Sequence, residues 1–260
     1  MSLKPDKKSD KGKRWISPRN EGKRKIKIPY HLVVTEGTKT EPNYFRGLRT
    51  AINNNDGLEK VHIEISGEGM NTVSLVEMAR QLARNAGNPY QHIWIVYDKD
   101  DFPAENFNSV VDLCKDATEE SGETEYHAIW SNQCVELWFL LHFSYFHSDI
   151  SRNDYYPKLS HHLKKIGCGS YSKNREDIFS VLRPNLPDAI KNADRLEIDN
   201  AGKTPALSAP GTQLHIIRRT SICSPPYSTN PFSSLPVLGY GCDQYPLILR
   251  ASFVFLPSFQ

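Results

Sequence analysis

Ile93-Trp94-Ile95-Val96-Tyr97-Asp98-Lys99-Asp100-Asp101 is a run of β-branched and aromatic residues that ends in a group of acids. A second run has the same plan: His31-Leu32-Val33-Val34-Thr35-Glu36-Gly37. Each apolar part is long enough for one buried strand of a parallel sheet. In open α/β sheets, ligands bind just past the carboxyl ends of the strands. If the two strands are neighbours, Glu36, Asp98 and Asp100 meet at one edge of the sheet.

The rest of the chain alternates strands and helices. The residue pattern predicts further strands at 61–65 and 126–130, and helices at 43–53, 73–85, 106–121 and 135–143. This β-α-β-α-β-α-β-α order predicts an α/β fold with a mostly parallel, four-stranded, doubly wound sheet flanked by helices. Residues 149–217 are polar and helical in pattern. We therefore expect a domain at 29–148 followed by a helical C-terminal extension at 149–217.

The two ends of the chain differ from this body. Residues 1–28 hold eleven Lys/Arg and three Asp/Glu, a balance of +8, so the other residues of a chain with net charge +2 must balance to −6. A disordered basic tail on an acidic body indicates a polyanion partner, or else a tail that only keeps the protein in solution. The candidate nucleic-acid contacts are Lys23, Arg24, Lys25 and Lys39. Residues 218–260 are rich in Pro and Ser and poor in charge, a composition that suggests an altered reading frame.

Bulk properties exclude several classes of protein. The mean hydropathy is −0.53, and no apolar stretch approaches the ~20 residues that cross a bilayer. The basic N-terminus lacks the apolar region of a signal peptide, so we expect a cytoplasmic protein without a membrane span. The five cysteines are scattered and form no CxxC pair, which argues against a disulfide framework and a cysteine-based zinc site.

The acids at the two strand ends point to a divalent cation. Asp98, Asp100 and Asp101 fall within four positions, and three such acids repel one another unless they are solvated or bound to a cation. Carboxylates with open positions between them suit Mg²⁺ or Mn²⁺ on a phosphate substrate. Taken alone, Thr35-Glu36-Gly37 is more typical of a surface turn than of a functional site. Together, the two motifs favour a shared metal site.

Three further residues are candidates for this site. Glu136 lies in an otherwise apolar helix after the fourth strand, where a carboxylate must be paired, hydrogen-bonded, metal-bound or satisfied by the helix dipole. His142 follows on the same segment and is either a ligand or a partly buried polar residue. Lys173, beside Tyr171, either contacts substrate phosphate or is solvated.

Two levels of resemblance follow from these motifs. A strand ending in Glu-Gly, a glycine after the second strand and a strand ending in Asp-x-Asp resemble the Toprim domain of topoisomerases, bacterial primases and OLD-type nucleases. More narrowly, the chain over 29–217 resembles the RloB-like family in three stretches: Glu36-Gly37-Thr38-Lys39-Thr40-Glu41-Pro42-Asn43-Tyr44-Phe45, Tyr97-Asp98-Lys99-Asp100, and Ser131-Asn132 with Glu136-Leu137-Trp138 and Leu141-His142-Phe143. It departs from that family where Gln133 and Val135 replace an expected Pro and Phe, and residues 218–260 have no counterpart.

The resemblance implies a Mg²⁺- or Mn²⁺-dependent nuclease of a phage-defence or abortive-infection system, often encoded beside an AAA/ABC-type ATPase. It implies that Glu36 is the acid/base or a metal ligand, that Asp98 and Asp100 hold the metal, and that Glu136 completes a second metal site. The resemblance makes Lys173 a catalytic residue that neutralises developing charge, and it gives supporting roles to Glu41, Asp101 and His142. It does not choose between DNA and RNA, and it leaves an oligomer open.

Two other functions compete with this one. The first is a non-catalytic Toprim module that binds nucleic acid or regulates its partner ATPase. The second is a Mg²⁺-dependent phosphotransferase of receiver-like build, which is disfavoured because its acidic pair should follow the first strand rather than the third.

Overall fold

The computed structural model describes residues 30–54, 62–67 and 72–219, which all belong to one unit of the chain. The predicted basic tail at 1–28, with Lys23, Arg24 and Lys25, lies outside the described residues. So does the Pro/Ser-rich tail from 220 onward.

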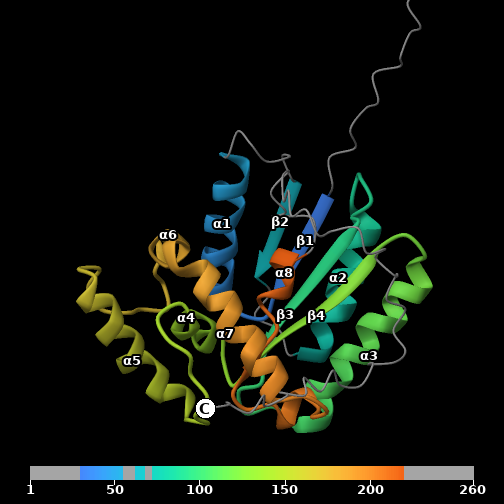
Figure 1. Ribbon diagram of the computed structural model, residues 1–260. Coiled ribbons are helices and arrows are strands. Elements are labelled where there is room, and N and C mark those ends of the chain that lie inside the picture. The colour runs from blue at the N-terminus through green and yellow to red at the C-terminus, as the bar shows by residue number, and fades with distance from the viewer. Residues whose placement is uncertain (1–29, 55–61, 68–71, 220–260) are drawn as a thin grey trace, which may run out of the picture. The chain divides into compact units, whose positions relative to one another are not determined.

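The described strands form one mixed sheet (Figure 1). In chain order they are β1 (Tyr30–Thr35), β2 (His62–Gly67), β3 (His92–Asp98), β4 (Glu125–Asn132) and β5 (Gly211–Thr212). Their order across the sheet is β2-β1-β3-β4-β5, and β1 to β4 run parallel. β1 and β3 are therefore neighbours, as the meeting of their acidic ends requires.

The expectation of a four-stranded sheet misses one strand. All four predicted strands are present, but β5 adds to β4 in the antiparallel sense, with Ser131 opposite Thr212. A two-residue strand carries no hydrophobic alternation, so periodicity does not reveal it. The Ser131 and Thr212 hydroxyl oxygens also lie 3.0 Å apart, which ties β5 to the end of β4.

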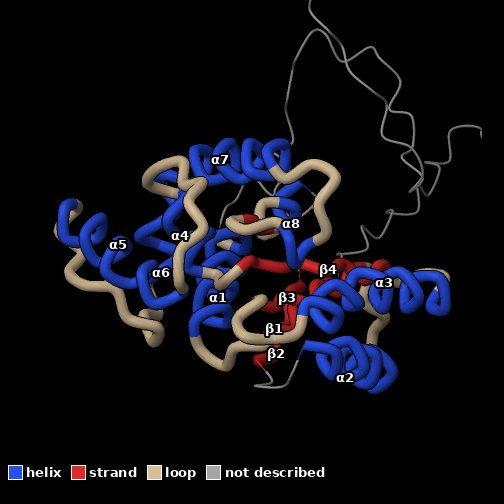
Figure 2. Tube along the Cα trace, turned by 90° about the horizontal axis from the view of Figure 1, so that it is seen from below, coloured by secondary structure: helices blue, strands red, loops and turns tan. Residues whose placement is uncertain are grey.

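Helices cover both faces of the sheet (Figure 2). In chain order they are α1 (Thr40–Asn53), α2 (Thr72–Asn85), α3 (Ala104–Ser121), α4 (Glu136–Leu141), α5 (Arg152–Lys165), α6 (Ile178–Leu182), α7 (Leu186–Asp199) and α8 (Ile216–Arg219), with 3-10 turns η2 (Arg183–Asn185) and η3 (Pro205–Leu207). Helices α2 and α3 share one apolar core with Leu32, Val34 and Ile95, whereas α1 and α4 share the other with Val33 and Trp94. Because both faces of the sheet are covered, the central strands β1 and β3 are almost continuously buried and mostly apolar.

The segment 149–217 is mostly helical, as predicted, and belongs to the same core as the sheet. Tyr155 and Leu159 of α5, Leu182 of α6 and Leu196 of α7 are all buried in the core that also contains Trp138 of α4. This extension also supplies β5, so it completes the sheet as well as covering it. Among the described residues, no helix has the length and apolar character needed to cross a membrane.

Candidate functional site

A pocket of about 270 Å³ lies where the parallel strands end. Five carboxylate side chains line it, together with two lysines and Tyr156; these residues are Glu36, Glu41, Asp98, Asp100, Glu136, Lys39 and Lys173. The structure thus brings together the predicted acids of the first and third strand ends, Glu41, the predicted acid of α4, and Lys39 and Lys173.

Glu36 bridges the ends of β1 and β3. Its backbone N–H donates to the Val96 carbonyl at 2.9 Å, which continues the pairing of the two strands. Its carboxylate Oε2 accepts a hydrogen bond from the Asp98 backbone N–H at 3.3 Å. Burial raises the pKa of Glu36 to about 7; the carboxylates of Asp100 and Glu41 add to this, and the Asp98 N–H opposes it. Glu36 therefore exchanges a proton near neutral pH.

Asp98 is the most enclosed acid at the strand ends. Its Oδ2 accepts a hydrogen bond from the Val135 backbone N–H at 3.1 Å. Its Oδ1 is buried and has no hydrogen-bond partner among the described residues. Burial, with the nearby charges of Glu41 and Glu136, raises the pKa of Asp98 well above its ordinary value. An orphaned buried carboxylate oxygen in a pocket lined by four other carboxylates fits a hard divalent cation.

Two glycines let the Glu41 carboxylate reach the pocket. Glu41 lies in the first turn of α1 and folds back onto Gly37, where a Cβ would fall only 2.1 Å from Glu41 Oε2. Gly67, at the end of β2, lies against the same loop, and a Cβ there would come within 2.9 Å of the Gly37 carbonyl oxygen. Burial and the Glu136 charge raise the pKa of Glu41, although Lys173 acts against them.

The Glu136 carboxylate is hydrogen-bonded by a residue of the C-terminal segment 149–217, not by a strand of the sheet. It is buried at the start of α4, and its Oε1 accepts a hydrogen bond from the Tyr171 hydroxyl at 2.7 Å. Lys173 lies two residues beyond Tyr171, and the Thr40 hydroxyl donates to its backbone carbonyl at 3.1 Å. Burial opposes the charge of Lys173, but hydrogen bonding to Tyr156 and the Glu136 and Asp100 carboxylates outweigh it and raise the pKa of Lys173.

Arg152 is the residue that sequence reasoning missed. Its guanidinium group contacts Asp100 Oδ1 at 2.9 Å and Asp101 Oδ2 at 3.0 Å, so it bridges the last two acids of the motif. Asp100 has a positive φ of 36° and donates its backbone N–H to the Gln133 carbonyl. Asp101 is 89% exposed in its side chain and lies outside the pocket lining. In the sequence, Arg152 is marked only by its position at the start of a polar segment with a helical pattern.

His142 also lies outside the pocket lining. It is buried, its Nδ1 is 2.9 Å from the Trp138 carbonyl, and its ring meets the Trp138 ring edge-on. Burial lowers the pKa of His142 to about 4, which keeps the imidazole neutral at physiological pH. These contacts are those of a buried polar residue that supports α4. Of the two interpretations that the sequence allows for His142, they favour this one over a metal ligand.

The carboxylates surround the pocket rather than converge on a point. No three of them have oxygen atoms that all lie within 4.8 Å of one another. Like charges favour such a spacing, and the cations Arg152 and Lys173 lie beside the acids. A cation that several of these acids share would draw them closer.

Fold and site together define an α/β protein with a carboxylate pocket at the carboxyl ends of a mostly parallel sheet. The family model described as RloB-like protein matches residues 31–217, and the chain belongs to the RloB-like family. Searches of curated proteins and of solved structures find no match.

Proposed function

We propose that this protein is a Mg²⁺- or Mn²⁺-dependent nuclease that hydrolyses phosphodiesters through a Toprim-type site. The observation that carries the proposal is Asp98, whose buried Oδ1 has no hydrogen-bond partner among the described residues and which lies beside a proton-exchanging Glu36. A cation ligand and a general acid/base in one pocket are the two groups that phosphodiester hydrolysis needs.

The metal would be held by Asp98 with Asp100 and Glu136, and Glu36 would either join these ligands or serve as the acid/base. Bound there, Mg²⁺ would acidify an attacking water and neutralise charge on the scissile phosphate. This role agrees with the donor set, which is entirely carboxylate oxygen, because hard cations prefer such ligands. Glu41 would support the site through its negative charge and its contact with Gly37.

The other side chains would manage protons and charge. Glu36 would hold a proton at its carboxylate or release it near neutral pH, since its pKa is about 7. Lys173 would counter negative charge that develops on the phosphate, because it lines the same pocket and its raised pKa keeps it cationic. The exposed Lys39 would meet the substrate backbone at the pocket entrance.

A neighbouring concavity offers a path for a nucleic-acid strand. It has a volume of about 940 Å³, lies between α1 and α6, and is lined by Arg46 and Arg183 among others. Asn43 lines this concavity and donates to the carbonyl of Asn174, which lines the acidic pocket, at 3.4 Å. Arginines beside a metal pocket suit a phosphate backbone.

One observation favours the alternative, a non-catalytic module that binds nucleic acid or regulates a partner ATPase. Arg152 already neutralises Asp100, so one of the expected metal ligands is engaged by a cation of the protein itself. If this ion pair persists in solution, the pocket holds fewer free ligands than a two-metal nuclease uses. Metal affinity therefore has to be measured, not only activity.

The biological setting belongs to the same proposal. We infer that the protein acts in phage defence or abortive infection, in the cytoplasm, beside an AAA/ABC-type ATPase. Membership of the RloB-like family supports this inference. The experiments below therefore include the ATPase partner as a separate arm.

The test is cleavage of mixed nucleic acids. Purified protein is incubated with single- and double-stranded DNA and with RNA, in Mg²⁺, Mn²⁺ or EDTA, with and without the ATPase encoded beside it. The matched variants are Asp98→Asn in the pocket and Asp112→Asn, an exposed acid of α3. We expect metal-dependent cleavage that Asp112→Asn retains and Asp98→Asn loses. Unchanged substrates in every condition, with metal binding and nucleic-acid binding intact, would establish the non-catalytic alternative.

A further inference from the structure

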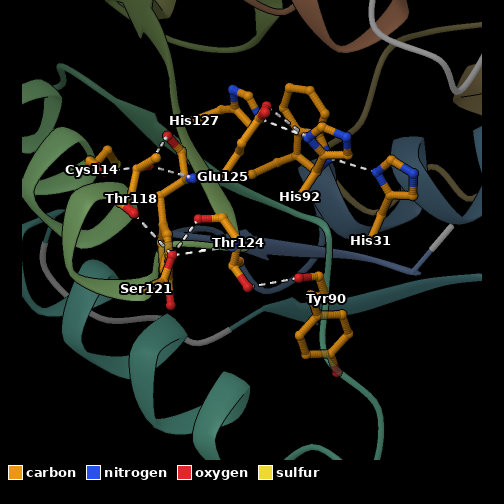
Figure 3. Close-up of polar contacts among 11 residues, drawn as sticks. His31, Tyr90, His92, Cys114, Thr118, Ser121, Thr124, Glu125 and His127 are labelled. Carbon is orange, nitrogen blue, oxygen red and sulfur yellow. Dashed lines mark hydrogen bonds and ion pairs between the residues drawn. The ribbon is translucent and has the colours of Figure 1, made fainter.

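A second group of metal-ligand side chains lies at the opposite end of the parallel strands, where β3 and β4 begin. His92 begins β3, whereas Asp98 ends it. At about 3.3 Å per residue, the two ends of this strand are roughly 20 Å apart. Figure 3 shows the side chains of His92, Glu125 and His127 pointing toward one another from the amino ends of β3 and β4.

The three side chains bring their ligand atoms to metal-site distances. His92 Nδ1 lies 3.1 Å from His127 Nε2 and 3.2 Å from Glu125 Oε2. His127 Nε2 lies 3.6 Å from the same Glu125 oxygen. Ligand atoms about 2.0–2.2 Å from a tetrahedral zinc ion are roughly 3.3–3.5 Å from one another. The three separations in this triangle bracket that value.

The strand register and an aromatic stack hold the triangle in place. His92 pairs with Glu125 and Trp94 pairs with His127 across the two strands, so all four side chains share one face of the sheet. The His127 ring stacks on the fully buried Trp94 ring with centroids 4.1 Å apart. His31 stacks on His92, and its Nδ1 accepts a hydrogen bond from Trp94 Nε1 at 3.3 Å. Rings fixed in this way are preorganised for a ligand.

Proton sharing alone does not account for this geometry. A proton on His92 Nδ1 can be shared between His127 Nε2 and Glu125 Oε2, but it leaves the lone pairs of these two acceptor atoms facing one another at 3.6 Å. A cation shared by all three atoms would satisfy every contact.

We propose that His92, Glu125 and His127 bind a divalent transition-metal ion of the zinc class. Two imidazole nitrogens and one carboxylate oxygen are the donor set that zinc accepts and that Mg²⁺ avoids. The side chains of His92 and His127 are 19% and 22% exposed and that of Glu125 is 59% exposed, so an ion can enter from solvent and keep one position open. The ion would join β3 to β4 and stabilise the amino ends of these two strands independently of the acidic pocket.

The test is zinc binding to the full chain after treatment with EDTA. Titration calorimetry with Zn²⁺ and visible absorption with Co²⁺ would measure affinity and coordination number. The variants are His127→Ala, Glu125→Gln and, as a matched control, His147→Ala, an exposed histidine outside the triangle. Asp98→Asn serves to separate this site from the acidic pocket. Circular dichroism would verify that each variant folds, and Glu125→Gln changes only an exposed side chain.

We expect one zinc equivalent whose affinity falls at least tenfold in Glu125→Gln and more in His127→Ala, while His147→Ala and Asp98→Asn bind as the parent does. Zn²⁺ would also raise the melting temperature of the parent, but not that of His127→Ala. The proposal is overturned if zinc does not bind at micromolar concentration. It is equally overturned if the triangle variants keep full affinity, which would direct attention to the other His/acid group, Asp194, Glu197 and His215. Neither result depends on nuclease activity.

Discussion

The carboxylate of Glu36 accepts a hydrogen bond from the backbone N–H of Asp98, across 3.3 Å and between residues 62 positions apart in the chain. This contact joins the ends of β1 and β3, which lie side by side in the sheet. Burial raises the pKa of both acids; the Asp100 and Glu41 carboxylates add to the rise at Glu36, and the Glu41 and Glu136 carboxylates add to the rise at Asp98. A cation is the partner that relieves this repulsion.

The first prediction concerns stability in the absence of metal. Asp98→Asn removes a buried negative charge and keeps an oxygen that can accept the hydrogen bond from the Val135 N–H. We expect the free energy of unfolding to rise by about 1–3 kcal/mol at pH 8 without Mg²⁺, because the charge is buried next to other acids. Urea unfolding followed by circular dichroism measures it.

In nuclease assays, the same substitution should lower the rate by about 100-fold or more. Asp112→Asn, on the exposed face of α3, should leave both stability and rate unchanged. A variant that loses activity together with stability would mean that Asp98 serves the fold rather than the reaction.

The second prediction is a pH dependence of stability that Glu36 carries. Its pKa is about 7 in the folded chain against an ordinary 4.5, so between these values the folded state holds a proton that the unfolded state has lost. The free energy of unfolding should therefore fall as pH rises from about 4.5 to about 7. Glu36→Gln should lack the part of this loss of stability that Glu36 causes. At pH 8 its free energy of unfolding should exceed that of the parent by about 1 kcal/mol, after allowance for solvent screening.

Denaturant titrations at several pH values, with Glu119→Gln as an exposed-acid control, would show this difference. Saturating Mg²⁺ should flatten the pH dependence in the parent, since a bound cation favours the ionised carboxylate. Parallel curves for the parent and Glu36→Gln across this window would contradict the prediction.

The four parallel strands and the place of the acids follow from local sequence. The runs that end at Glu36 and Asp98 are mostly apolar because both faces of the sheet are covered, and sheet topology then places their ends together. These inferences need only the period of the pattern and one general rule of α/β folds. For the same reasons, Glu136 falls at the same edge.

Features that depend on pairs distant in sequence were not predicted. Strand β5 pairs Thr212 with Ser131, 81 positions earlier in the chain. Arg152 reaches Asp100 from the start of α5, and His92 meets His127 only through strand register. No periodicity marks such contacts, because each depends on a single residue placed by the whole fold. For the same reason the sequence left His142 open between a ligand and a partly buried polar residue, since its position gives no indication of which side it faces.

The third prediction concerns Arg152, which competes with a metal ion for Asp100. Arg152→Gln removes the ion pairs to Asp100 and Asp101, whose distances are 2.9 and 3.0 Å. We expect Mg²⁺ or Mn²⁺ affinity, measured by calorimetry or Mn²⁺ paramagnetic resonance, to rise by roughly 3–10-fold, because a carboxylate is released from a cation. Arg84→Gln, an exposed Arg paired with Glu77, is the control. A weaker metal site in Arg152→Gln would mean that the arginine positions Asp100 for the metal.

The fourth prediction concerns Gly67, where β2 meets the Glu36–Gly37 loop. A Cβ at Gly67 would lie 2.8 Å from Pro42 Cγ and 2.9 Å from the Gly37 carbonyl oxygen, and backbone cannot shift without moving the loop that carries Glu36. Gly67→Ala should therefore lower the free energy of unfolding by about 1–3 kcal/mol and weaken Mg²⁺ binding as well. Gly87→Ala is the matched control, since nothing lies within 4 Å of its Cβ. It should be neutral or slightly stabilising. If Gly67→Ala lost stability while keeping full metal affinity, the loop would adjust without disturbing the carboxylates, and the close contact would matter only to the fold.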